Sequence, residues 1–405
     1  MLVARRAPRV VQTATRRPHR TVRCFAVGPR PGLYPPSVDA IDWGTAQRVG
    51  DLIAGSPGNE SPPGGRALIL GETVQPLALQ FARRVSEYSG LELPAQLPPL
   101  EAVDRSRWIA ANLQTMRPVL ESLAAEGLGP GGRSSRRMRF SSKHPGQDLG
   151  PLYDALGAAG GLLLGAQVGA MAGMLSQRVL GQYDLALLDP SVAPRLLLVA
   201  PNLAQAARTM QVDSEQLLAW VTIHEITHAV QFSGAPWLRE HLAGILRQLI
   251  DGLQVTVSLS ALLRLPSAGD ARAFAERLRH GELVRLTLGE QRWQLVERLQ
   301  ATMSLVEGHA EHVMDAVGAE VLPSLPRLRA AMNRRREHRG LPWRVLERLL
   351  GLELKLRQYE EGRRFCDAVV LAGGPTALAR AWRSAEDLPT AAELQEPELW
   401  LARVA

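Results

Sequence analysis

The chain has 405 residues, 46% of them hydrophobic, which is enough for one large domain or two ordinary domains with a proper core. Its two cysteines, Cys24 and Cys366, exclude a disulfide framework and a cysteine-based metal site, and they favour a reducing, cytoplasmic location. The net charge of +7 comes from residues 1–38, which contain eight arginines and no acidic residue. The rest of the chain has 39 basic and 40 acidic residues. The body of the chain is therefore nearly neutral, and we expect no nucleic-acid partner.

The Arg-rich segment 1–38 indicates a disordered tail. Such a tail could also bind anionic polymers or a membrane surface, and its composition is similar to that of a transit peptide. Apolar residues at helical spacing through Gln80–Tyr88 and Trp108–Leu123 predict a helical N-terminal lobe. The Gly- and Arg-rich stretch 127–146 predicts a solvated linker, with anion binding by its arginines as the alternative. We therefore assign residues 39–146 to this lobe and linker.

The segment Leu152–Leu175 is apolar and has a glycine at every fourth position. On a helix these glycines form one stripe against which another backbone can lie closely. A membrane-spanning helix is one interpretation of this pattern. The central Gln167, the few large aliphatic residues and the lack of a second such segment favour a buried helix of a soluble core instead. We expect no stable membrane insertion.

The rest of the chain is predicted to be helical, with little sheet. The short apolar run Pro194–Pro201 is bounded by prolines and predicts a buried or edge strand. Asp213 can cap a helix that continues through residue 228 without a breaker. Further helical patterns cover four segments, 236–265, 270–280, 290–317 and 343–370. The predicted fold class is mainly α with a small sheet, and residues 147–405 form the predicted catalytic domain.

A metal-binding motif lies on the helix that Asp213 begins. His224 and His228 are four residues apart, so both imidazoles project from one face and can meet at a single Zn²⁺. Glu225 is displaced by one residue around the helix, where it can reach a water molecule at the metal without being a ligand itself. The alternative without a metal is a pair of core histidines beside a solvated Glu225. The apolar flanks and the helical context favour the metal site.

A catalytic zinc site needs a third protein ligand. A histidine six residues after His228 would supply it in one known arrangement, but Gly234 stands there. The better candidates lie in residues 303–315, where ionisable groups crowd an apolar helix and need a partner. We take Glu307 as the ligand, because its spacing resembles that of zinc peptidases with a glutamate third ligand. From the residues alone the third ligand stays open among Glu307, Glu311, His309 and His312.

Five further residues are candidates for supporting roles. Glu311 shares a helix face with Glu307 and could accept the free imidazole N–H of a zinc ligand. His309 or His312 could donate to a developing oxyanion, and packing or surface roles are the alternatives. His241 could border the cleft or lie on the surface of its helix, and Tyr359 could contact substrate or serve a structural role.

Four stretches together resemble a known family. They are HEITHAVQFSGAPWLREHL, EGHAEHVMDAVG, GLELKLRQYEEGRRF and the glycine-repeat helix that ends in VLGQYDLALL. The chain resembles the zincin-like hydrolases and zinc-dependent metallopeptidases of actinobacteria and chloroflexi, some members of which are associated with the biosynthesis of a deazaflavin coenzyme. The resemblance runs from about Ile41 to the C-terminus. It implies a zincin-like, mostly helical, cytoplasmic protein.

The same resemblance implies a zinc site in which His224, His228 and Glu307 match the ligands and Glu225 matches the base. We therefore expect a zinc-dependent hydrolase, by default a metallopeptidase that cleaves an amide bond in a peptide or other amide substrate. The alternative is a catalytically silent zincin fold that works as a binding or scaffold protein. The sequence does not give the oligomeric state.

Overall fold

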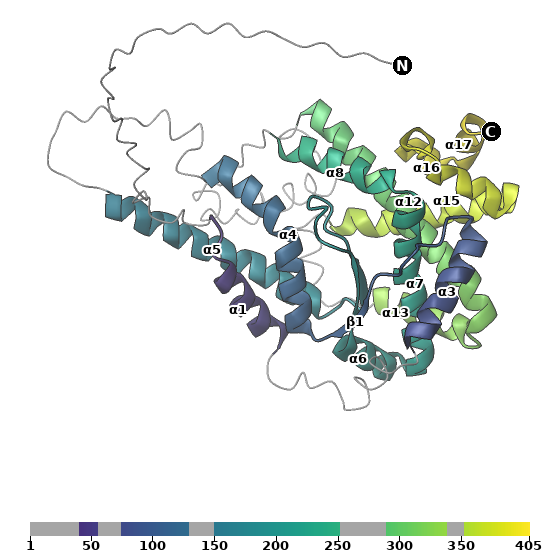
Figure 1. The fold of residues 1–405 in the computed structure, drawn as a ribbon, viewed down its shortest axis with the longest axis horizontal. Helices are drawn as coiled ribbons and strands as arrows, with labels where there is room; N and C mark the ends of the chain where they lie inside the picture. Colours follow the sequence, from purple (N-terminus) through teal and green to yellow (C-terminus); the bar gives the residue numbers. More distant parts are fainter. Residues whose placement is uncertain (1–39, 56–73, 129–149, 252–288, 338–351) are drawn as a thin grey trace, which may run out of the picture. The chain divides into compact units, whose positions relative to one another are not determined.

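The computed structural model of the protein describes residues 40–55, 74–128, 150–251, 289–337 and 352–405 (Figure 1). The Arg-rich tail 1–38, most of the linker and the predicted helix 270–280 lie outside these residues, as do parts of the predicted helices 236–265 and 343–370. The described chain is mainly helical with one small sheet, so the predicted fold class is confirmed. The N-terminal half contains α1 (Trp43–Ala54), α3 (Val74–Ser89), β1 (Leu100–Val103), α4 (Arg105–Leu128), α5 (Gly150–Ser176), β2 (Gly181–Asp184), β3 (Arg195–Val199) and α6 (Ala200–Met210). The C-terminal half contains α7 (Ser214–Gly234), α8 (Trp237–Ile250), α12 (Glu290–Val321), α13 (Leu325–Glu337), α15 (Leu352–Leu378), α16 (Ala391–Gln395) and α17 (Pro397–Arg403).

The sheet has three strands in the order β1-β3-β2, with β1 parallel and β2 antiparallel to β3. The predicted strand is its central member, β3, while β1 and β2 were not predicted. Both unpredicted strands have only four residues, too few for a recognisable alternation of polar and apolar side chains. Their strand state comes from hydrogen bonding to β3, a contact between distant parts of the sequence.

β3 separates two hydrophobic cores. Successive side chains of a strand point to opposite faces of the sheet. Leu196 and Leu198 accordingly belong to the large core around α7, whereas Leu197 and Val199 belong to a smaller core with residues of α1, α4 and α5. The prediction that residues 39–146 form a lobe separate from the catalytic domain stays a prediction, although β1 and α4 from that range both contact β3.

The site helix α7 begins at its predicted cap. The carboxylate of Asp213 accepts hydrogen bonds from the backbone N–H groups of Glu215 and Gln216, at 3.1 and 2.9 Å. These bonds satisfy donors that have no partner within the helix. From there α7 runs through the large core, where it packs against α3, α6, α12, β2 and β3. Packing on so many sides leaves the middle of α7 buried.

α12 and α15 approach each other at two glycines. A Cβ atom on Gly308 would collide with the backbone of Gly362 and Arg363, and one on Gly362 would collide with the backbone of Ser304. Only a residue without a side chain allows two helices to lie so close. This contact holds α12, which carries Glu307, firmly against α15.

The glycine-repeat helix α5 uses its stripe as predicted. A Cβ atom on Gly165 or Gly169 would collide with backbone atoms of Asp42 or Ala46, and one on Gly173 would come within 2.5 Å of the Gly50 carbonyl oxygen. The glycine stripe therefore lets α1 pack directly against the backbone of α5.

The expectation that α5 is a buried helix is wrong for its other faces. Leu162 and Leu163 are 47% and 48% exposed, and Met171 is also exposed. Within the described residues, Gly157–Ser176 is the one helical stretch long and apolar enough to cross a bilayer, with a mean hydropathy of 1.5, and 22% of it is buried. A single stretch of this kind is weak evidence for a membrane span. The partial burial follows because only the glycine face meets neighbouring helices.

Candidate metal centre

The helices α7 and α12 lie against each other (Figure 1). They bring together the side chains of His224, His228 and Glu307. The Nε2 atoms of His224 and His228 are 3.3 Å apart. One carboxylate oxygen of Glu307 lies 3.6 Å from Nε2 of His224 and 3.5 Å from Nε2 of His228. The sequence prediction named these three residues, and the structure places them in one cluster.

The spacing of the three atoms fits a tetrahedral metal ion. With bonds of about 2.0–2.1 Å, as zinc makes to nitrogen and oxygen, two ligand atoms of a tetrahedron are about 3.3–3.4 Å apart. The three observed separations, 3.3, 3.5 and 3.6 Å, form a nearly equilateral triangle of that size. The donor set of two imidazoles and one carboxylate is also one that zinc accepts. Three such protein ligands would leave a fourth position for water or substrate.

Glu225 lies beside this cluster and is 6% exposed. Its carboxylate accepts a hydrogen bond from the backbone N–H of Tyr183 on β2. Burial raises the pKa of Glu225, and the neighbouring Glu307 raises it further, while His224 and His228 oppose the shift. A carboxylate with a raised pKa holds a proton more readily, which suits a general base.

The space for the Glu225 carboxylate depends on Gly181. A Cβ atom at Gly181 would lie 2.7 Å from Oε1 of Glu225. The short strand β2 thus contributes two features that orient this carboxylate, a glycine that leaves room and an N–H that donates. Neither feature was predicted, because both depend on the pairing of β2 with β3.

Gln231, which the sequence analysis did not single out, fixes the ring of His228. The Gln231 side chain is fully buried, and its Nε2 lies 2.8 Å from the carbonyl oxygen of Val306 and 2.8 Å from Nδ1 of His309. Since a carbonyl oxygen only accepts, the amide NH₂ must point to that side, and Oε1 of Gln231 faces Nδ1 of His228 at 2.8 Å. The proton of a neutral His228 therefore sits on Nδ1, and the lone pair on Nε2 is directed at the cluster. The spacing of three residues between His228 and Gln231 was the only signal in the sequence.

His309 is a buried packing residue. It is 1% exposed, accepts from Gln231 and packs edge-on against Trp382, with ring centroids 4.8 Å apart. Burial lowers its pKa to about 3, so the ring is neutral. Of the two roles considered for His309, oxyanion donor or packing residue, these contacts support the second.

His312 points away from the three-ligand cluster into a separate set of polar groups. Its Nδ1 lies 2.6 Å from a carboxylate oxygen of Asp367, and its Nε2 lies 2.8 Å from the hydroxyl of Tyr88. Glu311 is 7% exposed. The partner of the His228 ring is Gln231, and the support of a ligand ring by Glu311 stays a prediction.

The two remaining candidates lie on other helices. His241 is half-buried on α8 and packs edge-on against Trp237, and burial lowers its pKa. Tyr359 lies in α15, but its side chain falls outside the part of the chain whose side chains the structure describes. Substrate contact by either residue stays a prediction.

The fold and the His, His, Glu cluster together define a protein of the zincin-like class. The sequence model of the zincin-like metallopeptidase family matches residues 41–401, and the chain therefore belongs to this family. The crystal structure of a candidate hydrolase with a novel fold from Chloroflexus aurantiacus is similar, with a TM-score of 0.61 and 27% sequence identity over 90% of this chain and 98% of that one. No curated protein matches the chain. The resemblance stated from the sequence is confirmed.

Proposed function

We propose that the protein is a zinc-dependent hydrolase that cleaves an amide bond, with a peptide as the default substrate. The observation that carries this proposal is the triangle of His224, His228 and Glu307 atoms at tetrahedral spacing, with the buried Glu225 carboxylate beside it. Membership of a metallopeptidase family supports the reaction class.

Each residue has a distinct task in this proposal. His224, His228 and Glu307 would hold the zinc ion, which supplies Lewis acidity toward water and a carbonyl group. Glu225 accepts the proton of the attacking water and passes it to the leaving nitrogen. The N–H of Tyr183 and the space at Gly181 keep the Glu225 carboxylate oriented for both transfers. Gln231 holds the proton of a neutral His228 on Nδ1, which would leave the Nε2 lone pair free to bind the ion.

Metal content and hydrolysis of a mixed peptide library test the proposal together. The wild type should bind about one zinc per chain, and His228→Ala and Glu307→Ala should each lose it. Glu225→Gln should keep the zinc and lose hydrolysis, because the amide cannot accept the proton. Full activity in Glu225→Gln would contradict the mechanism. Stoichiometric zinc in a wild type that hydrolyses no library member would favour the scaffold alternative.

We also propose a cytoplasmic location for the protein. Support comes from the scarcity of cysteine and from Cys366, which is buried and not part of a disulfide. Fractionation of cells that express the full chain tests this proposal, and secretion or recovery from an oxidising compartment would contradict it.

A further inference from the structure

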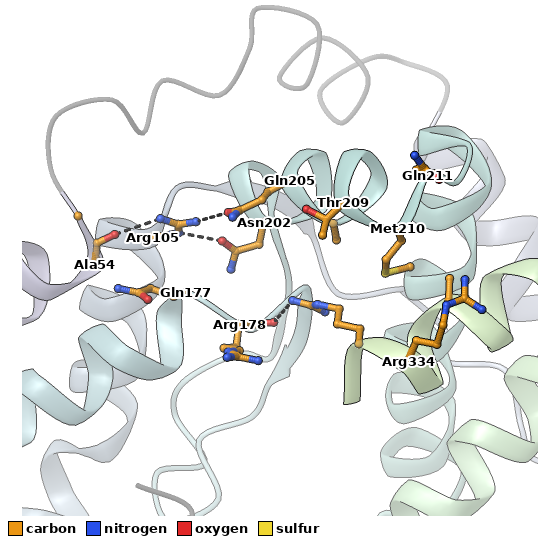
Figure 2. Close-up of a pocket in the computed structure, with 14 residues that line it drawn as sticks. Ala54, Arg105, Gln177, Arg178, Asn202, Gln205, Thr209, Met210, Gln211 and Arg334 are labelled. Atoms are coloured by element: carbon orange, nitrogen blue, oxygen red, sulfur yellow. Dashed lines mark hydrogen bonds between the residues drawn. The ribbon is translucent and has the colours of Figure 1, made fainter. Parts of the chain in front are cut away.

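A cavity lies apart from the metal centre, between α1, α4, α6, α13 and the residues that directly follow α5 (Figure 2). Its volume is about 830 Å³. None of the described residues that line it belongs to α7 or α12, the helices that carry the metal cluster. A molecule bound in this cavity would therefore touch none of the residues to which we assign the hydrolysis.

The lining of this cavity is strongly basic. It contains four arginines, and none of its described residues is an aspartate or a glutamate; the arginines are Arg105, Arg178, Arg334 and Arg335. The remaining polar side chains of the lining are neutral amides and a hydroxyl group. Each of the four arginines also takes part in other interactions of the chain, so the inference rests on the sign and number of the charges.

Arg105 is held in a fixed position on one wall of the cavity. Its guanidinium donates to Oδ1 of Asn202 at 2.8 Å, to Oε1 of Gln205 at 3.0 Å and to the carbonyl oxygen of Ala54 at 3.1 Å (Figure 2). All three of these acceptors are neutral. Burial lowers the pKa of Arg105, but an arginine remains charged at neutral pH.

Asn202 is itself held by hydrogen bonds, so it fixes the position of Arg105. This side chain is 2% exposed, and its amide NH₂ donates to the carbonyl oxygens of Ser176 and Val179, at 2.7 and 2.6 Å. The orientation of the amide is therefore determined, and Oδ1 must face Arg105. A buried amide thus holds a cation at the edge of the cavity before any ligand arrives.

The other three arginines of the lining come from two places in the chain: Arg334 and Arg335 from α13, and Arg178 from the segment that follows α5. Arg334 lies across the cavity from Arg105 and belongs to α13 (Figure 2). Its neighbour Arg335 donates to the backbone carbonyl oxygen of Arg178 at 3.1 Å, which ties α13 to the end of α5. Positive charges that three segments of the chain hold around one cavity attract anionic groups that enter it.

We propose that this cavity binds a small molecule that carries two or more anionic groups of the phosphate or carboxylate type. Guanidinium groups donate to such groups through two parallel hydrogen bonds, and the neutral amides can bind the uncharged part of the molecule. The volume falls within the range of about 300–1,000 Å³ that small-molecule sites occupy. Two anionic groups match charges that stand on separate walls of the cavity.

Calorimetric titration of pyrophosphate and of citrate into the zinc-loaded full chain, at constant ionic strength, tests this proposal. At least one of the two probes should bind saturably, and Arg334→Gln should weaken that binding by about tenfold or more. Arg327→Gln is the matched control, because Arg327 is an exposed arginine of the same helix that does not line the cavity. Binding to the control should equal binding to the wild type.

The two probes distinguish the sources of the anion. Saturable binding of pyrophosphate alone identifies a phosphate-bearing ligand, and that of citrate alone identifies a polycarboxylate. Arg105→Lys keeps the charge but loses the planar donor fork, so it should also weaken binding while the protein stays folded. If neither probe binds saturably, or if Arg334→Gln and Arg327→Gln weaken binding equally, the proposal is overturned.

Discussion

At the scale of single residues, the tautomer of His228 depends on a neighbour that binds no metal. Gln231 has all of its amide contacts inside the protein, with His228 on one side and with Val306 and His309 on the other. Such partners of a ligand ring typically change metal affinity by about 10–100-fold when they are removed. The network therefore connects the orientation of the His228 ring on α7 to the packing of α12.

Replacement of Gln231 by leucine should expose this connection. Gln231→Leu removes the acceptor for Nδ1–H of His228, so we expect zinc affinity to fall about 10–100-fold, measured by competition with a chromophoric chelator. Thr222→Val is the control, since Thr222 is buried on the same helix and its hydroxyl has no hydrogen-bond partner in the described part of the chain. Equal affinities in the two variants would contradict the role of Gln231.

At the scale of elements, close backbone contacts at glycines decide which helices pair. The α1–α5 and α12–α15 pairs both depend on glycines at which a Cβ atom would meet the backbone of the partner helix. Glycine in the interior of a helix costs about 0.5–1 kcal/mol relative to alanine, so its presence there needs a compensating contact. In α5 some glycines have such a contact and others do not.

Alanine substitutions along α5 should therefore have opposite signs. Gly160 has open space around its would-be Cβ atom, and Gly160→Ala should raise the free energy of unfolding by about 0.5–1 kcal/mol. Gly169 meets the Ala46 carbonyl oxygen, and Gly169→Ala should lower it by about 1–3 kcal/mol through overpacking. Urea denaturation measures both changes. Stabilisation by both substitutions would show that α1 does not rest on the glycine stripe.

The junction of α12, α13 and α15 contains a carboxyl group with an unusual pKa. Asp315 lies 2.9 Å from Arg329 and 3.3 Å from Arg363, yet one of its oxygens is buried and has no hydrogen-bond partner among the described residues. Burial raises the pKa of Asp315 to about 6, and this effect outweighs the attraction of Arg363. The charged neighbours Glu311 and Asp367 raise the pKa further, and His312 lowers it.

A raised pKa in the folded state makes stability depend on pH. The stability that protonated Asp315 contributes is fully present below the unfolded pKa of about 3.9 and is lost as the pH rises through about 6. We therefore expect the difference in unfolding free energy between the wild type and Asp315→Asn to favour the wild type more at pH 5 than at pH 7. Urea denaturation at both pH values gives this difference. An unchanged difference would mean that Asp315 titrates at its ordinary pKa.

At the scale of the whole molecule, the apolar face of α5 raises the question of membrane association. α5 contains the only described stretch that has the length and composition of a membrane span. The helix α1, which packs against it, carries charged residues such as Arg48 and Asp51. Burial of these charges in hydrocarbon would be costly. Insertion of α5 would therefore require its separation from α1.

The full chain should accordingly leave the membrane fraction without detergent. We expect its recovery in the supernatant after lysis and a wash at high salt, as judged by immunoblotting of both fractions. Retention in the pellet after alkaline carbonate extraction would contradict this prediction and would indicate an inserted α5. If the wild-type protein leaves the membrane fraction only at high salt, it is bound at the membrane surface.

The sequence by itself determined the features that depend on local geometry. The four-residue spacing of His224 and His228, the cap at Asp213 and the glycine stripe of α5 all follow from helix periodicity and hydrogen bonding within a few residues. The region of the third candidate ligand was also predictable, because ionisable residues on an otherwise apolar helix need a partner. The choice of Glu307 within that region came from the resemblance of its spacing to that of zinc peptidases. The central strand β3 was predictable because it is a continuous apolar run.

The tertiary structure alone decided what depends on contacts between distant segments. The strands β1 and β2 exist through pairing with β3, so Gly181 and the N–H of Tyr183 reach Glu225 only after the sheet has formed. The role of Gln231 required the crossing of α7 and α12, and the exposed face of α5 required knowledge of which helices pack on it. Local patterns set the residues of each element, whereas the free energy of packing and pairing selects which elements meet.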